Sequence, residues 1–227
     1  MSTQGYRHEY KFLVNESDIA ALRARLSAFM RRDAFHTESD GRYTVRSLYF
    51  DNASDDALRE KLDGVDEREK FRIRCYDEDS AFIRLEKKEK RHGLCRKVSA
   101  PLTHAQAEAL IAGDSAFLRD SPHPLLNELS IKMSTLQLRP RALVIYDREA
   151  YAYPAGNVRI TFDSRVRSGL NQIDLFNYGL PMARVLPAPY TILEVKFDDY
   201  LPDFIRALCR LDARVQTACS KYALCRI

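Results

Sequence analysis

The sequence has 227 residues, of which 45% are hydrophobic, 10% aromatic and 30% charged, and this composition excludes an intrinsically disordered chain. Its formal net charge of +4 is too small to indicate nucleic-acid or membrane-surface binding by itself. No stretch reaches the roughly 18 apolar residues of a membrane span, and the amino-terminal segment MSTQGYRHEYKF lacks the apolar core of a signal peptide. We therefore expect one soluble, cytoplasmic domain over residues 1–227.

Short segments of alternating apolar and polar residues predict eight strands. They are Tyr6–Val14, Tyr43–Asp51, Glu69–Asp77, Phe82–Lys90, Leu94–Ala100, Arg141–Ala152, Val158–Val166 and Thr191–Asp198. Helical spacing predicts helices at Ser17–Met30, with Ser17 as N-cap and Phe29 on the apolar face, and at Thr103–Ala112, Asn127–Leu136 and Leu201–Leu211. Because helices and strands do not alternate regularly, the expected class is α+β with a largely antiparallel sheet.

Successive residues of a strand point to opposite faces, and in five of these strands one face is charged. In REKFRIRCY, for example, Arg68, Lys70, Arg72 and Arg74 oppose an apolar face. A solvent-facing side of a half-buried sheet would explain each strand taken alone. However, cations cluster here with few carboxylates, and like charges side by side destabilise a sheet. We therefore expect an anion to bind among them.

If the strands close into a barrel with their apolar faces outward under the helices, the charged faces line a water-filled bore. The expected fold is an eight-stranded antiparallel β-barrel tunnel with a charged interior, flanked by helices. Such a bore would hold a linear polyanion, with carboxylates binding a divalent metal that bridges phosphate oxygens. Three E-x-K triplets, beginning at Glu9, Glu86 and Glu194, each place a carboxylate and an ammonium group on one strand face and support this interpretation.

A series of short motifs carries a family resemblance. The motifs are YRHEYKF, VRSLYFD, KLDG, REKFRIRCY, IRLEKKEK, RKVSAPL, YDREAY, VRITFD, ILEVKFD and SKY. In order and spacing, from about residue 6 to residue 222, they resemble the VTC (polyphosphate polymerase) domain of the triphosphate tunnel metalloenzyme (CYTH-like) superfamily. The resemblance implies an eight-stranded antiparallel tunnel, Mn²⁺ or Mg²⁺ as cofactor, and ATP, triphosphate or polyphosphate as ligand.

The resemblance also implies roles for individual residues. The expected catalytic residues are Arg72, Arg74, Arg148, Arg159 and Lys88. The expected phosphate-binding residues are Lys11, Lys61, Lys97, Lys196, Ser220, Lys221 and Tyr49. The expected metal ligands are Glu194, Glu86 and Glu9. Whether Arg96 or Lys97 points inward depends on a one-residue register, and we expect Lys97.

The first strand distinguishes two branches of the superfamily. In the hydrolytic branch that this chain resembles less, the first strand carries an E-x-E-x-K pattern. The corresponding residues of this chain are Arg7, Glu9 and Lys11, so that a cation replaces the first carboxylate. This departure favours the polymerase-like branch over a two-metal triphosphatase. It also implies fewer metal ions.

Phosphoryl transfer needs positioning and charge neutralisation more than covalent help from the protein. We therefore expect a metal-dependent phosphotransferase in which the end of a growing polyphosphate attacks the γ-phosphate of ATP. One alternative is hydrolysis of inorganic triphosphate in the same tunnel. Another is a polyphosphate- or nucleotide-binding module without turnover. Because the family's domain often belongs to membrane assemblies, a separate membrane protein is a candidate partner.

Other functions are not indicated. Single-strand nucleic-acid binders interleave aromatic residues with cations, whereas here the strand aromatics alternate to the face opposite the charges, so no nucleic-acid ligand is expected. No P-loop motif is present. The histidines form no catalytic or zinc pattern and are expected on the surface or in loops: His8, His36, His92, His104 and His123. The five cysteines are expected to be reduced thiols.

Overall fold

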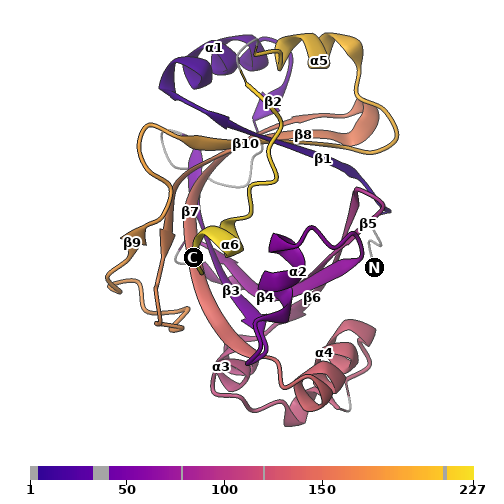
Figure 1. Ribbon diagram of the computed structural model, residues 1–227, viewed down its shortest axis with the longest axis vertical. Coiled ribbons are helices and arrows are strands. Elements are labelled where there is room, and N and C mark those ends of the chain that lie inside the picture. The colour runs from indigo at the N-terminus through magenta and orange to yellow at the C-terminus, as the bar shows by residue number, and fades with distance from the viewer. Residues whose placement is uncertain (1–4, 33–40, 78, 120, 212–213) are drawn as a thin grey trace.

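A computed structural model describes residues 5–32, 41–77, 79–119, 121–211 and 214–227 of the chain. Within them, eight strands form a curled antiparallel sheet in the order β1-β10-β8-β7-β3-β4-β5-β6 (Figure 1). Their bounds are β1 His8–Val14, β3 Arg42–Asp51, β4 Arg68–Tyr76, β5 Asp79–Arg91, β6 Leu94–Leu102, β7 Arg139–Tyr153, β8 Val158–Ser168 and β10 Thr191–Phe197. These are the eight predicted strands. Two further strands, β2 (Arg31–Arg32) and β9 (Ala183–Arg184), pair with β7 and β8 and are too short to show alternation.

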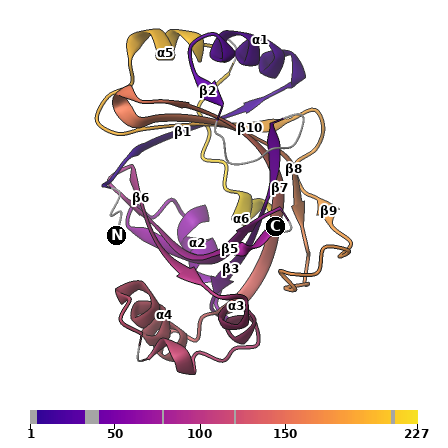
Figure 2. The ribbon, with the colours of Figure 1, turned by 180° about the vertical axis from the view of Figure 1, so that it is seen from behind.

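The two edge strands of the sheet, β1 and β6, approach each other as the sheet curls (Figure 2). Arg7, just before β1, and Cys95 of β6 exchange two backbone hydrogen bonds of 2.9 Å. A continuous ladder between the two edges, which the predicted closed barrel would have, is not seen among the described residues. The observed fold is therefore an α+β protein with a curled antiparallel sheet whose edges meet at one bridge.

Helices cover the outer sides of the curled sheet. The pair α1 and α5 lies over one side, and α3 and α4 lie over the opposite side (Figures 1 and 2). The bounds of the helices are α1 Glu16–Ser27, α2 Asp56–Leu62, α3 His104–Ile111, α4 Pro124–Thr135, α5 Asp203–Leu208 and α6 Lys221–Leu224, with 3₁₀ turns at Ala116–Leu118 and Ala155–Asn157. The predicted helices are all present, whereas α2 and α6 are too short for a periodic pattern to reveal.

Helix α1 begins earlier than predicted. Its N-cap is Asn15, whose side chain accepts a hydrogen bond from the Asp18 amide, while the Asp18 side chain accepts one from the Asn15 amide, each at 2.9 Å. This reciprocal capping box satisfies two amides that the helix leaves unpaired. Ser17 therefore lies inside the helix. The predicted apolar face is also shorter, because Phe29 lies beyond the helix end and is 59% exposed.

The first residues of the other three predicted helices also differ from the prediction. Thr103 is the N-cap of α3, as its capping box with Gln106 requires. Helix α4 begins before the expected residue 127 because the His123 side chain accepts from the Leu125 amide and caps it. Pro202 is the N-cap of α5 and not part of its first turn.

The apolar sides of the strands pack outward against these helices. In one buried cluster, Phe71, Ile73 and Leu85 of β4 and β5 pack with Leu110 of α3 and Leu129 of α4. A second cluster joins β8 and β10 to α1 and α5 in the same way. Each fully buried side chain of this size contributes roughly 1.5–3 kcal/mol. Because neighbouring residues of a strand alternate, this packing turns the charged residues toward the concave side of the sheet.

Candidate functional site

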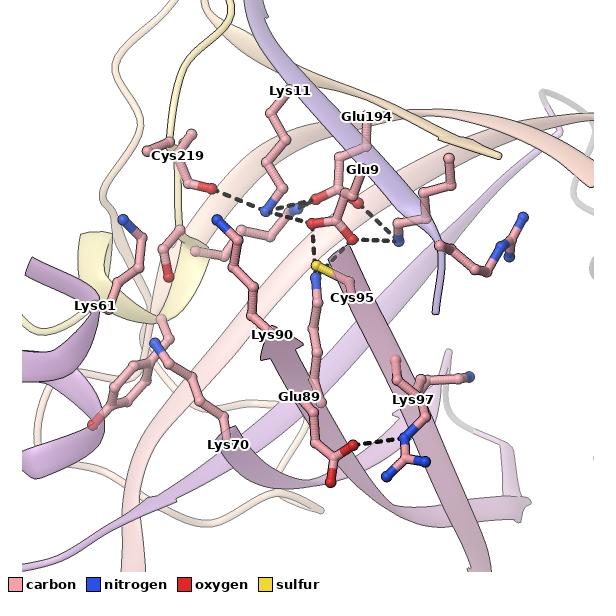
Figure 3. A pocket seen from close by; sticks show the side chains of 18 of the residues that line it. Glu9, Lys11, Lys61, Lys70, Glu89, Lys90, Cys95, Lys97, Glu194 and Cys219 are labelled. Atoms are coloured by element: carbon pink, nitrogen blue, oxygen red, sulfur yellow. Dashed lines mark hydrogen bonds and ion pairs between the residues drawn. The ribbon is translucent and has the colours of Figure 1, made fainter. Parts of the chain in front are cut away.

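A cavity of about 530 Å³ lies on the concave side of the sheet (Figure 3). Each of the eight main strands contributes to its lining, together with Lys61 of α2 and the segment 216–222 that leads into α6. Every residue predicted from the sequence as catalytic, phosphate-binding or metal-binding lines this cavity, except Glu86. The curled sheet thus brings together side chains from both ends of the sequence.

The lining is strongly cationic. It includes fifteen basic side chains: Arg7, Lys11, Lys61, Arg68, Lys70, Arg72, Arg74, Lys88, Lys90, Arg96, Lys97, Arg148, Arg159, Lys196 and Lys221. Three carboxylates line it among the described residues: Glu9, Glu89 and Glu194. A concave surface with this surplus of positive charge attracts anions and raises their local concentration.

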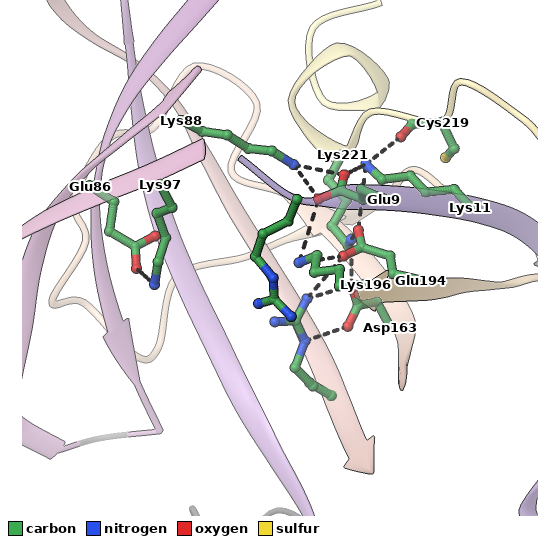
Figure 4. A network of polar contacts seen from close by, with 12 residues as sticks. Glu9, Lys11, Glu86, Lys88, Lys97, Asp163, Glu194, Lys196, Cys219 and Lys221 are labelled. Carbon is green, nitrogen blue, oxygen red and sulfur yellow. Dashed lines mark hydrogen bonds and ion pairs between the residues drawn. The ribbon is translucent and has the colours of Figure 1, made fainter. Parts of the chain in front are cut away.

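Two of these carboxylates, Glu9 of β1 and Glu194 of β10, lie together and share the ammonium groups of Lys11 and Lys196 (Figure 4). Lys11 Nζ lies 3.2 Å from Glu9 and 3.5 Å from Glu194, and Lys196 Nζ lies 3.7 Å and 3.1 Å from the same two residues. Lys88 of β5 donates to both oxygens of Glu9 at 2.7 Å. The arrangement follows from strand register, because Lys11 lies opposite Glu194, and Glu9 opposite Lys196, in the β1–β10 pair.

A buried ion-pair network extends from Glu194 toward α6. Lys221 donates to Glu194 at 2.7 Å and also contacts Asp163 of β8. Arg148 of β7 donates to both oxygens of Asp163, at 2.6 Å and 2.7 Å, and lies 3.8 Å from Glu194. All four side chains are buried. The carboxyl-terminal helix is therefore tied to three strands of the sheet by charge-assisted contacts.

These contacts set the protonation states of the site. Burial raises the pKa of Glu194, but Lys196 and Lys221 outweigh it and hold the pKa well below its usual value. The pKa of Glu9 is also lowered, since Lys88 and Lys11 outweigh its burial. Burial lowers the pKa of Lys196 to about 8, although both carboxylates oppose this shift. At neutral pH, Glu9 and Glu194 are therefore ionised and can act as oxygen ligands.

Glu86 belongs to a different group of charges. Arg72 donates to it through Nε at 2.9 Å and through Nη2 at 2.6 Å, and Lys97 donates to it at 3.0 Å. Arg74 Nη1 lies 3.6 Å from the same carboxylate. Arg72 also donates to the Tyr49 hydroxyl at 2.7 Å. Glu86 thus fixes the orientation of two arginines that line the cavity while its own carboxylate does not line it.

This position differs from the predicted role of Glu86 as a metal ligand. Glu86 lies apart from Glu9 and Glu194 (Figure 4), so the three predicted ligands do not form one group. Strand alternation places all three carboxylates on charged faces, but it does not indicate which cations each one contacts.

The register of β6 places Lys97 opposite Lys88, on the face that carries Glu86. Arg96 lies opposite Glu89 and donates to it at 2.6 Å. Both Lys97 and Arg96 contribute to the lining of the cavity.

The remaining predicted residues reach the cavity from separate elements. Arg159 of β8 donates to the Tyr43 hydroxyl at 3.0 Å. Ser220 is the N-cap of α6, and its hydroxyl accepts from the Ala223 amide at 3.4 Å. Lys11 also donates to the carbonyl oxygen of Cys219 at 3.0 Å.

Three further residues line the cavity although the sequence analysis gave them no role in the site: Arg68, Lys70 and Lys90. They lie on the charged faces of β4 and β5, so strand alternation could have identified them.

The donor set fits a divalent cation held jointly with a ligand. Among the residues that the structure describes, no three Asp, Glu, His or Cys side chains form a ready-made metal site. Glu9 and Glu194 nevertheless supply hard oxygen donors side by side. Mg²⁺ is commonly bound by one or two carboxylates together with substrate phosphates and water, and Mn²⁺ accepts the same oxygen donors. The two carboxylates therefore fit Mg²⁺ or Mn²⁺ bound together with a phosphate compound.

Three histidine and cysteine residues contribute to the lining of the cavity: His8, Cys95 and Cys219. His8 was expected on the surface or in a loop, but it lies in strand β1. His92 is 83% exposed at its side chain, His123 caps α4, and His36 lies outside the described residues. All five cysteines are free thiols. Cys75 is buried in the cluster beneath α3 and α4.

The fold and the cavity together define an α+β protein with a curled antiparallel sheet and a cationic concave site. A family model of the VTC domain matches residues 6–226. The chain belongs to the VTC domain family, as its motifs predict. No curated protein sequence matches it significantly.

Two solved structures share the fold. The PH1012 protein of Pyrococcus horikoshii OT3 has a TM-score of 0.53 and 14% identity, over 96% of this chain and 98% of that one. The PH1819 protein of the same organism has a TM-score of 0.50 and 15% identity, over 96% and 97% of the two chains. At these identities the likeness shows the fold alone. In the described part of the chain, no helix is long and apolar enough to cross a membrane.

Proposed function

We propose that this protein is a polyphosphate polymerase-like phosphotransferase that binds ATP and polyphosphate in the basic cavity with a divalent metal. One observation carries the proposal: fifteen Lys and Arg side chains surround the adjacent carboxylates of Glu9 and Glu194 in one cavity. A polyphosphate chain presents many closely spaced negative charges and matches this lining. Family membership supports the same ligand class.

In this proposal the arginines hold the reacting phosphates. Arg72 and Arg74 are oriented by Glu86, and Arg148 by Asp163, so that their planar forks present several donors to phosphate oxygens. The other members of this reacting group are Arg159 and Lys88. The phosphate chain is bound further by Lys11, Lys61, Lys97, Lys196, Ser220, Lys221 and Tyr49. Each charge-assisted hydrogen bond contributes roughly 1.5–3 kcal/mol.

Glu9 and Glu194 would hold the Mn²⁺ or Mg²⁺ ion, and we assign Glu86 to positioning the arginines. The metal, when bound, neutralises phosphate charge. The reaction forms a bond between the terminal oxygen of the polyphosphate and the γ-phosphorus of ATP. The bond between that phosphorus and the β–γ bridging oxygen breaks, and ADP leaves with the electron pair. The chain's own contribution is alignment and charge neutralisation.

The wider setting is proposed on the same basis. The edges of the sheet would form a closed tunnel around a bound phosphate chain, with residues 1–227 acting as one domain in the cytoplasm. A separate membrane protein is the expected partner, on the resemblance to a family whose domains often belong to membrane assemblies.

The test is an assay of the purified protein with Mn²⁺ and γ-labelled ATP, followed by gel separation of products. The proposal predicts label in chains that lengthen with time. A parallel reaction with inorganic triphosphate measures orthophosphate release. Release of orthophosphate and pyrophosphate from triphosphate, without chain growth from ATP, would instead establish a triphosphatase. Tight binding without any product would establish a binding module.

A further inference from the structure

The charged face of β4 ends in an aromatic residue. Tyr76 is the last residue of this strand, two positions after Arg74 on the same face, and its side chain lines the cavity. The ring centroid of Tyr43 from β3 lies 5.8 Å from that of Tyr76, and the centroid of Phe82 from β5 lies 5.4 Å from it. Three neighbouring strands therefore contribute one ring each. We call Tyr43, Tyr76 and Phe82 the aromatic end.

Both partner rings of Tyr76 are held by arginines. Arg159 donates a hydrogen bond of 3.0 Å to the Tyr43 hydroxyl. The guanidinium carbon of Arg84 lies over the Phe82 ring, 4.7 Å from its centroid. The plane of Tyr76 is inclined by 58° to Tyr43 and by 57° to Phe82, so neither partner stacks flat against it. A ring that is already fixed from two sides loses little conformational freedom when a flat ligand packs on it.

The other aromatic side chains of the cavity have different surroundings. A cation lies 5.5 Å or less from the ring centroid of each of the other three lining tyrosines: Tyr49, Tyr146 and Tyr222. The ring of His8 stacks on Phe197, with centroids 4.8 Å apart and planes inclined by 16°. The guanidinium of Arg74 is farther from the Tyr76 centroid, at 6.0 Å. Tyr76 is therefore the lining tyrosine with mainly aromatic neighbours.

The aromatic end borders the arginines proposed to hold the reacting phosphates. Tyr76 follows Arg72 and Arg74 at alternate positions, so at about 3.3 Å per residue it lies about 7 Å along the strand beyond Arg74. Arg159 contacts Tyr43 directly. In a nucleoside triphosphate, one ribose separates the base from the α-phosphate. A base packed on Tyr76 would therefore leave its phosphates beside Arg74 and Arg72.

The chemistry of the aromatic end suits a nucleobase. Aromatic side chains bind bases through their π-faces, and this contact needs no hydrogen bond to the base. A phosphate, by contrast, needs donors that Tyr43 and Phe82 do not offer it, because the Tyr43 hydroxyl already accepts from Arg159 and Phe82 has no polar group. A purine has two fused rings and offers more contact area than a pyrimidine.

We propose that Tyr76, held by Tyr43 and Phe82, stacks on the base of the nucleoside triphosphate and gives the site a preference for purine nucleotides. This inference rests on the proposed function, in which a nucleoside triphosphate is the phosphoryl donor. It names a residue that selects the donor, because stacking distinguishes nucleotides whose phosphates and ribose are identical.

The first test uses the wild-type protein and four β,γ-imido nucleotide analogues, which carry adenine, guanine, cytosine or uracil. These analogues prevent turnover and differ only in the base. Titration calorimetry with Mg²⁺ should show that the adenine and guanine analogues bind about fivefold more tightly than the other two. Equal binding of all four analogues would overturn the inference.

The second test uses variants of the ring. Tyr76→Leu should weaken binding of the adenine analogue by about tenfold and remove the purine preference, while binding of triphosphate, which has no base, changes by less than about twofold. Tyr76→Phe keeps the ring and should match the wild type. The matched control is His8→Leu, which removes another ring from the lining and should keep the purine preference.

Two results with these variants would also count against the inference. Equal weakening of the adenine analogue and of triphosphate in Tyr76→Leu would mean that the ring only supports the phosphate site. Loss of the purine preference in His8→Leu, with Tyr76→Leu unchanged, would place the base at β1. Failure of the proposed function is seen separately, because a protein that lengthens no chain from ATP can still be compared for its binding of the four analogues.

Discussion

Lys221 donates a hydrogen bond of 2.7 Å to Glu194, and both side chains are buried. Lys221 begins α6, at the carboxyl end of the described chain, and Glu194 lies in the middle of β10. The contact therefore makes the carboxyl-terminal segment part of the cavity wall. It also means that one lysine contributes both to stability and to the charge of the site.

Lys221→Met should lower the free energy of unfolding by about 3 kcal/mol, because removal of one partner leaves buried carboxylates less well paired. Urea denaturation measures the change. Lys97→Met is the control: its side chain is 41% exposed and also contacts a carboxylate, so its loss should cost less than about 1 kcal/mol. Equal losses in the two variants would contradict the structural role of Lys221.

Glu194→Gln and Glu86→Gln should give different kinetic defects. Glu194→Gln should abolish metal-dependent turnover, because it removes a proposed metal ligand, while the protein keeps its fold as seen by circular dichroism. Glu86→Gln should keep the Mn²⁺ dependence of the wild type but bind triphosphate about tenfold more weakly, because Arg72 and Arg74 lose their anchor. Activity measured against Mn²⁺ and against triphosphate distinguishes the two, and a Mn²⁺ requirement raised in Glu86→Gln would return that residue to the metal site.

Metal and phosphate should stabilise the protein together. Glu9 and Glu194 alone supply few ligands, so Mn²⁺ by itself should change the melting temperature little. Mn²⁺ with triphosphate, at about one hundred times the dissociation constant, should stabilise the protein by about 2.7 kcal/mol. Thermal unfolding with each component and with both measures this linkage. A full shift with Mn²⁺ alone would indicate a metal site built from protein ligands only.

Lys70 should make stability depend on pH in a defined direction. Its folded-state pKa of about 7 lies below its ordinary value of 10.5, so the unfolded chain binds more protons between these values. The resulting cost to stability is fully present below pH 7 and disappears as the pH rises toward 10.5. The stability difference between Lys70→Met and the wild type should therefore be largest near pH 6 and decrease steadily above pH 7, as urea denaturation at several pH values would show. A difference independent of pH would contradict this assignment.

Strand alternation in this sequence was sufficient to predict the sheet. The apolar sides of β4, β5, β8 and β10 pack against the helices that cover the sheet, so each of these strands must alternate between apolar and charged residues. It also placed Lys70 and Lys90 on charged faces. It could not reveal α2 or α6, because helices of about two turns and one turn are too short to show a period. The N-cap of α1 was misplaced because Ser17 and Asn15 both suit that position, and only Asn15 has Asp18 at the spacing of a capping box.

The contacts within the site required coordinates. Glu86 and Glu194 stand in the same E-x-K setting in the sequence, yet one holds Arg72 and the other holds Lys221. The difference arises from which elements are neighbours: β5 lies beside β4, which carries Arg72, whereas β10 lies beside β1 and β8 and is contacted by Lys221 of α6. The pairing of Asp163 with Arg148 depends on the β7–β8 register in the same way. Local patterns specify faces, but partners depend on the order of the strands and on where α6 lies.

Arg7 and Cys95 join the two edges of the sheet by only two backbone hydrogen bonds. Two such bonds contribute about 1–3 kcal/mol in water, far less than the long ladder between β3 and β7. Lys88 of β5 adds a side-chain contact to Glu9 of β1 across this seam. Parting of the seam still breaks far fewer interactions than unfolding, so the amides of Arg7 and Cys95 should exchange with deuterium before those of the central strands. The proposed phosphate chain would then enter sideways between the parted edges, without threading from one end.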